Sequence, residues 1–405
     1  MNGRSCCTLI GLLAVLLALA CSGDDDSGGG SGGMGSGGGS SGASGGHSGA
    51  SGASGASGGQ SGASGASGQT GSGAGGAGGA TAGNGGSGGS NTIQTGDCDN
   101  ADGQIFPPDA AWNQNIESAP LAGDSGAVID YLQANHDTGA RFQVDFSITV
   151  LEADASTPKE AFTPNDDFYE PDCDPAPVPI VEGGALEGED GYACESDGDC
   201  HLIVRAPNEC RLYEMWRANK NGSDFSGGCM AVWNIDEVYP ETGRGDFCTS
   251  ADAAGLPIAP LLFSADEIAA GEIKHAIRFI LPNEHIRELL FVRPGTHATR
   301  ATGGPAEAPP YAARLRLSAD ADLSQLNDAA KVVARGLQRY GMILADGGNL
   351  TFTAKSDRFD EHSWDEVGFG PNDLKALSWS DFEMVDGGTP IDWESGSCER
   401  SQVTE

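Results

Sequence analysis

Three histidines are the side chains best suited to proton chemistry near neutral pH, and each lies on or just after a predicted strand. His201 begins one strand, His275 lies inside a strand predicted over residues 273–281, and His297 follows a strand that ends near residue 293. Strand alternation places His275 on the face that carries isoleucine and phenylalanine. An imidazole in an apolar cleft beside a carboxylate is suited to acid–base catalysis. The alternative is a core histidine bonded to backbone, and the sequence leaves both open.

Asp252 and Asp346 are the carboxylates predicted to work with these histidines. Asp252 lies in a Ser/Ala/Gly/Pro-rich segment that must be a loop, and functional side chains are often carried on loops. Asp346 precedes two glycines between two short predicted strands, a pattern typical of a β-hairpin turn. Turn or capping roles explain both positions equally well.

Ligand-binding candidates come from a predicted strand and from an acidic segment. Arg314 and Arg316 alternate with leucines, so both arginines share one strand face, which is either solvated or able to hold a carboxylate or sugar hydroxyls. Trp364 stands among carboxylates and is predicted to be exposed, where it could stack on a sugar ring.

No metal site is predicted with defined ligands. The chain has no CxxC pair, and Glu272 and His275 have an E-x-x-H spacing that would point to opposite faces of a strand. Residues 97–103 are similar to a calcium loop, but Ala101 stands where a ligand is needed. Calcium binding by acidic loops is left open, and no other cofactor is expected.

The elements that must position these residues are mostly strands. Helices are predicted over residues 125–135, with Ser125 as N-cap, and over 265–271 and 326–340. Alternation predicts one long strand over residues 142–150, and shorter strands are predicted at 201–206, 211–216, 230–235, 273–281, 289–293, 312–317, 342–345 and 349–354. We therefore expect a mainly β (α+β) fold, a single β-sandwich-like domain with peripheral helices over residues 97–405.

The first hundred residues predict export and anchoring. Residues 1–20 have one arginine and a short apolar run and are typical of a signal peptide, and residues 18–21 resemble a bacterial lipobox. Cys21 is the expected lipidation site. Residues 21–96 are rich in Gly, Ser and Ala and predict a disordered tether. We expect a lipid-anchored protein of the cell envelope, at the outer membrane or cell surface.

Eight cysteines remain in the domain, and an even number in an exported chain predicts up to four disulfides. We expect Cys194 to pair with Cys200 across a short acidic loop. We also expect Cys98 to pair with Cys398 and so join the ends of the domain.

The charge limits the partners. The chain has 58 Asp and Glu against 22 Lys and Arg, a formal net charge of −36. Such a field repels nucleic acid and favours neutral or cationic ligands. The sequence does not predict an oligomeric state.

Three segments carry a resemblance to a known family. Residues 249–258 (TSADAAGLPI), 271–279 (GEIKHAIRF) and 340–346 (YGMILAD) are similar to a family of uncharacterised exported bacterial proteins and lipoproteins. The resemblance implies one exported globular domain and carries no catalytic roles. Cys229 and Cys248 are additions to the pattern, which suggests a local disulfide between them.

Two functions from different classes fit these observations, and the sequence does not decide whether the domain is an enzyme. The first is an extracellular hydrolase of a neutral glycan, with Asp252 or Asp346 as acid or nucleophile and His275 as proton carrier. It predicts that His275 and an acidic side chain meet in a pocket. The second is a non-catalytic surface module that binds glycan or calcium.

Overall fold

A computed structural model of the chain describes residue 98 and residues 104–136, 142–196, 198–349 and 351–405. The chain divides into two units, residues 1–85 and 86–405, and all described residues belong to the second. The predicted signal peptide, the lipidation site Cys21, the tether and most of the calcium-like loop lie outside the described residues.

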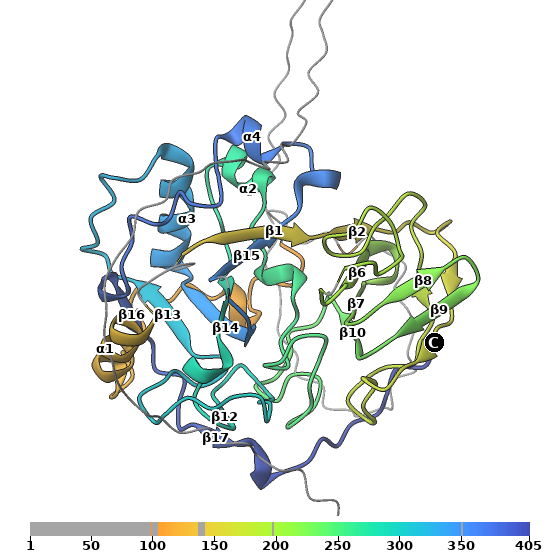
Figure 1. The fold of residues 1–405 in the computed structure, drawn as a ribbon, viewed down its shortest axis with the longest axis horizontal. Coiled ribbons are helices and arrows are strands. Elements are labelled where there is room, and N and C mark those ends of the chain that lie inside the picture. The colour runs from red at the N-terminus through yellow and green to blue at the C-terminus, as the bar shows by residue number, and fades with distance from the viewer. Residues whose placement is uncertain (1–97, 99–103, 137–141, 197, 350) are drawn as a thin grey trace, which may run out of the picture. The chain divides into compact units, whose positions relative to one another are not determined.

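The larger of two principal sheets has six strands in the order β1-β15-β11-β14-β13-β16 (Figure 1). Pairs β1/β15 and β11/β14 are parallel, and the other neighbours are antiparallel. The strands are β1 (Val144–Ile148), β11 (Ile277–Leu281), β13 (Arg314–Leu317), β14 (Met342–Gly347), β15 (Phe352–Lys355) and β16 (Phe382–Met384).

The second principal sheet has four strands in the order β10-β7-β6-β2. They are β2 (Val150–Glu152), β6 (Leu202–Ala206), β7 (Arg211–Met215) and β10 (Met230–Asn234). The single strand predicted over residues 142–150 is therefore wrong. It is two strands, one in each sheet, with Thr149 between them, because the chain passes directly from one sheet into the other.

Seven short strands form three small sheets at the periphery, β12-β17, β3-β5 and β4-β9-β8. Their bounds are β3 (Lys159–Glu160), β4 (Thr163–Pro164), β5 (Val178–Pro179), β8 (Asn219–Asn221), β9 (Asp224–Gly227), β12 (Leu290–Phe291) and β17 (Ile391–Asp392).

The helices are α1 (Ser125–Asn135), α2 (Ala265–Ala270), α3 (Asp328–Arg339) and α4 (Trp364–Val367). The three predicted helices are confirmed to within two residues at each end. The N-cap prediction is wrong: Asp124 is the N-cap of α1, and the Ser125 hydroxyl instead accepts a hydrogen bond from the Met384 backbone at 2.8 Å. Short 3₁₀ turns lie at Ala111–Asn113, Pro207–Glu209, Ala259–Leu261, Asn283–His285, Asp357–Phe359, Trp379–Asp381 and Trp393–Ser395.

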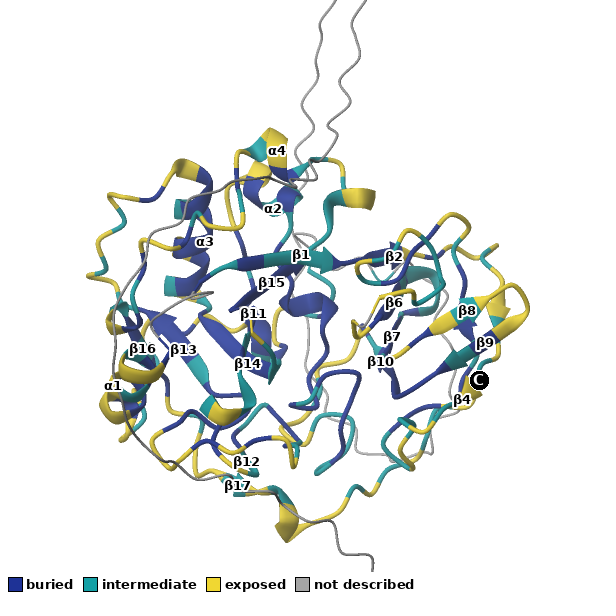
Figure 2. Cartoon of the chain, viewed as in Figure 1, coloured by how far each residue is buried: buried dark blue, intermediate teal, exposed yellow. Residues whose placement is uncertain are grey.

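One large hydrophobic core joins the two principal sheets, and Figure 2 shows their strands as mostly buried. Alternation along β6 explains how: Ile203 packs into the shared core, whereas Leu202 and Val204 pack into a second core on the other face. Helices α1 and α3 pack at the β16 and β13 side of the larger sheet. The fold is mainly β, with few helices at the periphery, as the sequence predicted.

Four disulfides stabilise the domain: Cys98–Cys210, Cys173–Cys229, Cys194–Cys200 and Cys248–Cys398. The Cys194–Cys200 prediction is confirmed. The Cys98–Cys398 and Cys229–Cys248 predictions are wrong, because pairing follows contacts between distant strands and loops. The bridges indicate folding in an oxidising compartment, extracellular or exposed at the cell envelope. Among the described residues, no helix has the length and apolar character needed to cross a membrane.

Candidate functional site

A buried arginine, Arg278, lies at the centre of the candidate site. It is on β11 and is 3% exposed. Its Nε and Nη2 atoms donate to the two carboxylate oxygens of Asp252 at 3.1 and 2.9 Å. Nη2 also donates to Asp346 Oδ2 at 3.3 Å, and Nη1 donates to the hydroxyl of Thr353 at 3.1 Å. The two predicted aspartates therefore meet on one cation.

Asp346 is positioned by the parallel pair β11 and β14. It lies near the carboxyl end of β14, opposite Ile280 of β11. The hairpin prediction for Asp346 is wrong, because β11 lies between β14 and β15 in the sheet. An added Cβ at Gly347 would lie 2.4 Å from the side-chain oxygen of Asn283, so a larger residue there would require Asn283 to move.

Asp252 is positioned by its own loop. Its backbone N–H donates to the Ser250 hydroxyl at 3.0 Å, and that hydroxyl donates to the Leu256 carbonyl at 2.6 Å. This loop, the start of β11 and the end of β14 belong to the three segments that carry the family resemblance. All three segments therefore meet at Arg278.

The two aspartates differ in accessibility. Asp252 is fully buried with both oxygens on Arg278, whereas the side chain of Asp346 is a quarter exposed. Burial, together with repulsion from Asp252, raises the pKa of Asp346 to about 8. Asp346 is therefore the carboxyl of this site that retains a proton at neutral pH.

Asp346 lines a cavity of about 680 Å³ at one end of the four-stranded sheet. Its other polar lining side chains include Asp172, Asp199, His297 and Arg300. The rings of Tyr169, Trp216, Tyr311 and Trp393 line the same cavity.

His297 faces this cavity as a neutral imidazole. Its Nδ1 is 2.7 Å from the Ala253 carbonyl, so Nδ1 carries the proton and Nε2 is the acceptor. The ring packs edge-on against Trp393 at 4.9 Å. Burial lowers the pKa of His297 below its ordinary value. One cavity thus contains a carboxyl with a raised pKa and a histidine with a lowered pKa.

No protein-family model, no curated protein and no solved structure matches this chain. The resemblance drawn from the three segments stays a prediction, and function must be argued from the site itself.

His201 is bonded to the loop that carries Asp252. Its Nδ1 is 2.6 Å from Glu187 and its Nε2 is 3.2 Å from the Ala251 carbonyl, next to Asp252. Burial lowers the pKa of His201, but the Glu187 carboxylate outweighs burial and raises it to about 9. Both ring nitrogens are occupied, so His201 positions the loop and is not free to exchange protons with a ligand.

His275 is not brought to Asp252 or Asp346. It precedes β11 in irregular structure, so its predicted place inside a strand is wrong. Its Nε2 lies 3.1 Å from Glu267, and both line a separate cavity of about 450 Å³. Its Nδ1 bonds to the Ala276 carbonyl at 2.8 Å, and Glu267 also completes the capping box of α2. His275 and Glu267 therefore meet in a pocket, as the hydrolase hypothesis required of His275 and an acidic side chain. However, both side chains already bond to neighbouring backbone, which leaves them a structural role.

The predicted ligand-binding residues lie elsewhere. Arg314 and Arg316 donate to backbone carbonyls of residues 111–119, and neither lines the Asp346 cavity. The prediction that Trp364 is exposed is wrong. It is 7% exposed and packs against Phe146 and Phe263, because α4 folds back onto the core.

Sequence reasoning missed Arg278, Glu187, Trp216 and Trp393. Arg278 alternates with His275, Ile277 and Phe279 in the strand predicted over residues 273–281, which puts it on the opposite, polar face. Its flanking isoleucine and phenylalanine are the one signal in the sequence that it is buried. The groups of potential metal ligands found among the described residues all include disulfide-bonded cysteines, so none offers three free ligands.

Proposed function

We propose that the domain is an extracellular hydrolase of neutral glycans, with Asp346 as general acid and His297 as general base. One observation carries this proposal: a carboxyl with a raised pKa and an imidazole with a lowered pKa line the same cavity. Environments that separate two pKa values in this way assign the acid and the base.

The chemistry follows from the protonation states. Asp346 gives its proton to the glycosidic oxygen as the bond to the anomeric carbon breaks. His297 Nε2 takes a proton from a water molecule whose oxygen attacks that carbon. Solvent then returns the proton from His297 to Asp346. Asp252 stays bound to Arg278 and keeps Asp346 protonated, so Asp252 is a positioning residue.

The lining of the cavity supports a sugar substrate. Trp216, Trp393 and Tyr169 offer ring faces or edges on which a sugar can pack. Asp172 and Asp199 add negative charge to a chain that is already acidic, which disfavours uronate-containing substrates.

The place of action is proposed from the disulfides and the leader sequence together. We propose that Cys21 carries lipid and that the domain is anchored in the cell envelope, at the outer membrane or cell surface. The partners are then a membrane, through the lipid, and an extracellular glycan.

The test is turnover by the full-length protein on a panel of neutral oligosaccharides, with product analysis. Asp346→Asn should lower kcat about 100-fold or more, because the general acid is lost. Asp328→Asn is the matched control, since Asp328 is a fully exposed aspartate on α3. Binding of a glycan without turnover would overturn the hydrolase in favour of the alternative, a non-catalytic module for glycan or calcium.

The pH profile gives a second test. Activity requires a neutral His297 and a protonated Asp346, so kcat/KM should rise through a pKa below 6.5 and fall near pH 8. A rate that keeps rising above pH 9 would exclude Asp346 as the acid.

A further inference from the structure

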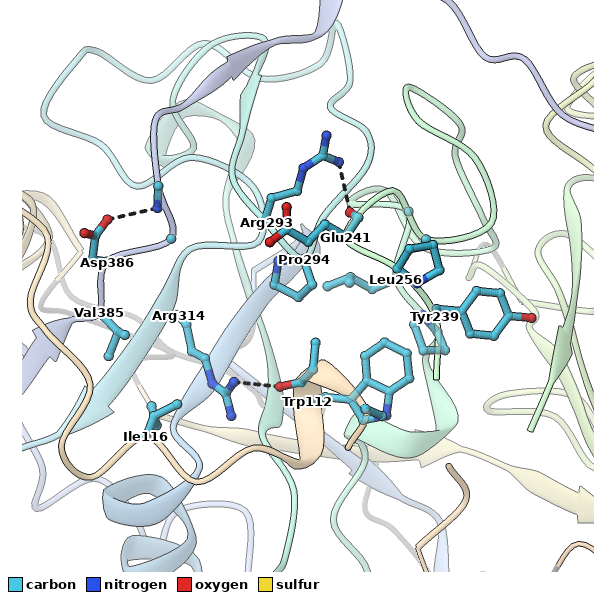
Figure 3. A pocket seen from close by; sticks show the side chains of 18 of the residues that line it. Trp112, Ile116, Tyr239, Glu241, Leu256, Arg293, Pro294, Arg314, Val385 and Asp386 are labelled. Carbon is cyan, nitrogen blue, oxygen red and sulfur yellow. Dashed lines mark hydrogen bonds between the residues drawn. The ribbon is translucent and has the colours of Figure 1, made fainter. Parts of the chain in front are cut away.

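A third cavity, of about 730 Å³, shares no lining residue with the Asp346 cavity. Figure 3 shows Trp112, Leu256, Pro294 and Val385 around it, with the guanidinium of Arg314 at one side. Most of this lining is apolar or aromatic. A ligand that fills the cavity therefore needs an apolar body.

Arg314 is a cation without a carboxylate partner among the described residues. Its Nε, Nη1 and Nη2 donate to the carbonyls of Tyr340, Ala111 and Gln114 at 2.8 to 2.9 Å. Burial alone lowers the pKa of Arg314 to about 10. A guanidinium has five N–H donors, so two remain after these three bonds.

Arg316, on the same face of β13, shows how the fold satisfies such a cation elsewhere. It also donates to three carbonyls, those of Ile116, Glu117 and Ala119. In addition, its Nη2 bonds to the carboxylate of Glu383 at 2.8 Å. Arg316 is thus paired with a carboxylate of the protein. Arg314 has no such partner among the described residues and lines the cavity instead.

We infer that this cavity binds a small organic monocarboxylate with an apolar or aromatic body, its carboxylate bonded to the guanidinium of Arg314. A carboxylate accepts two parallel N–H bonds from a guanidinium, which matches the donors that remain. Arg293 also lines the cavity, but it is already paired with the carboxylate of Asp246. Three acidic residues, Asp109, Glu241 and Asp386, line the cavity as well, and their repulsion limits the ligand to a single negative charge. This inference is independent of the proposed hydrolase.

The experiment compares an acid with its uncharged analogue on the full-length protein. 3-Phenylpropionate and 3-phenylpropionamide are titrated calorimetrically up to about 10 mM, a range that reaches weak binding. The acid should bind saturably and at least about ten-fold more tightly than the amide. Absence of saturable binding of the acid, or equal binding of the amide, overturns the inference.

Two variants locate the binding site. Arg314→Gln should weaken binding of the acid at least about ten-fold. Arg335→Gln, at an exposed arginine on α3, should leave binding unchanged. Thr389→Trp places an indole at an exposed position of the cavity lining and should block the acid without altering the guanidinium. If Arg314→Gln does not fold, Thr389→Trp and the acid–amide comparison decide. Unchanged binding in Thr389→Trp overturns the inference.

Discussion

The Arg278 and Arg314 regions differ in how much negative charge surrounds the arginine. Arg278 is surrounded by more negative charge than it can neutralise, since Asp252 and Asp346 both bond to it and Glu187 lies within its electrostatic reach. Arg314 is bonded only to neutral carbonyls. Excess negative charge leads the first region to retain a proton on Asp346. The second region lacks an anion, which a ligand can supply.

The largest expected effect comes from removing each arginine in turn. Arg278→Met leaves Asp252 as an unpaired buried anion and should lower the free energy of unfolding by about 3–5 kcal/mol. Arg314→Met removes a cation that has only carbonyl partners and should cost about 1–3 kcal/mol, from the lost bonds to those carbonyls. Guanidinium chloride denaturation measures both. Equal losses in the two variants would contradict the contrast in charge balance.

The next effect tests whether Asp346 holds its proton. A carboxyl with a pKa raised from 3.8 to about 8 binds more protons folded than unfolded, so its contribution to stability falls between about pH 4 and pH 8. Asp346→Asn lacks this loss. The stability of Asp346→Asn relative to the wild type should therefore increase across that range, by up to about 1.4 kcal/mol for each unit by which the pKa is raised. A constant difference between the two proteins from pH 4 to pH 8 would mean that Asp346 is ionised throughout.

The contribution of the His201–Glu187 pair to stability should change at higher pH than that of Asp346. The pKa of His201 is about 9 in the folded state and near 6.5 when unfolded. Its stabilisation is therefore fully present below pH 6.5 and is lost as the pH rises through 9. His201→Gln should cost roughly 3 kcal/mol more at pH 6 than at pH 10. His362→Gln is the comparison: Asp266 also raises the pKa of this half-exposed histidine, so the variant should show a difference of the same sign that is smaller because of solvent screening.

The smallest effect should come from making Arg316 resemble Arg314. Glu383→Gln removes the carboxylate from Arg316, but the side chain of Glu383 is a third exposed. The loss should be within about 1 kcal/mol, as for other partly solvated ion pairs. A loss above about 3 kcal/mol would show that Glu383 is essential to the carbonyl-bound arginines, and would weaken the contrast with Arg314.

Local patterns predicted the helices and most strand positions well. The helix at Ser125–Asn135 was predicted with its observed bounds, because its limits depend on neighbouring residues. The strand expected over residues 273–281 is shorter, since residues 273–276 are irregular, and Lys274 and His275 line a cavity there. Local alternation does not carry that information.

The candidate site was predicted only in part. Asp252 and Asp346 were chosen separately, and their meeting on Arg278 depends on β11 lying between β14 and β15, which no spacing in the sequence indicates. His297 was predicted as one of three candidate histidines, and His275 was the one preferred as proton carrier. What distinguishes it is that one of its ring nitrogens bonds to a carbonyl while the ring lines the Asp346 cavity, a property of tertiary structure.

Thr149 has a consequence for how the domain can be divided. It is the single residue between Ile148, paired with Lys355 in the larger sheet, and Val150, paired with Ile203 in the smaller one. A one-residue insertion there would turn every following side chain of β2 to the opposite face. The two sheets are therefore not separable modules. They should melt in one calorimetric transition, and fragments cut at this junction should not fold independently.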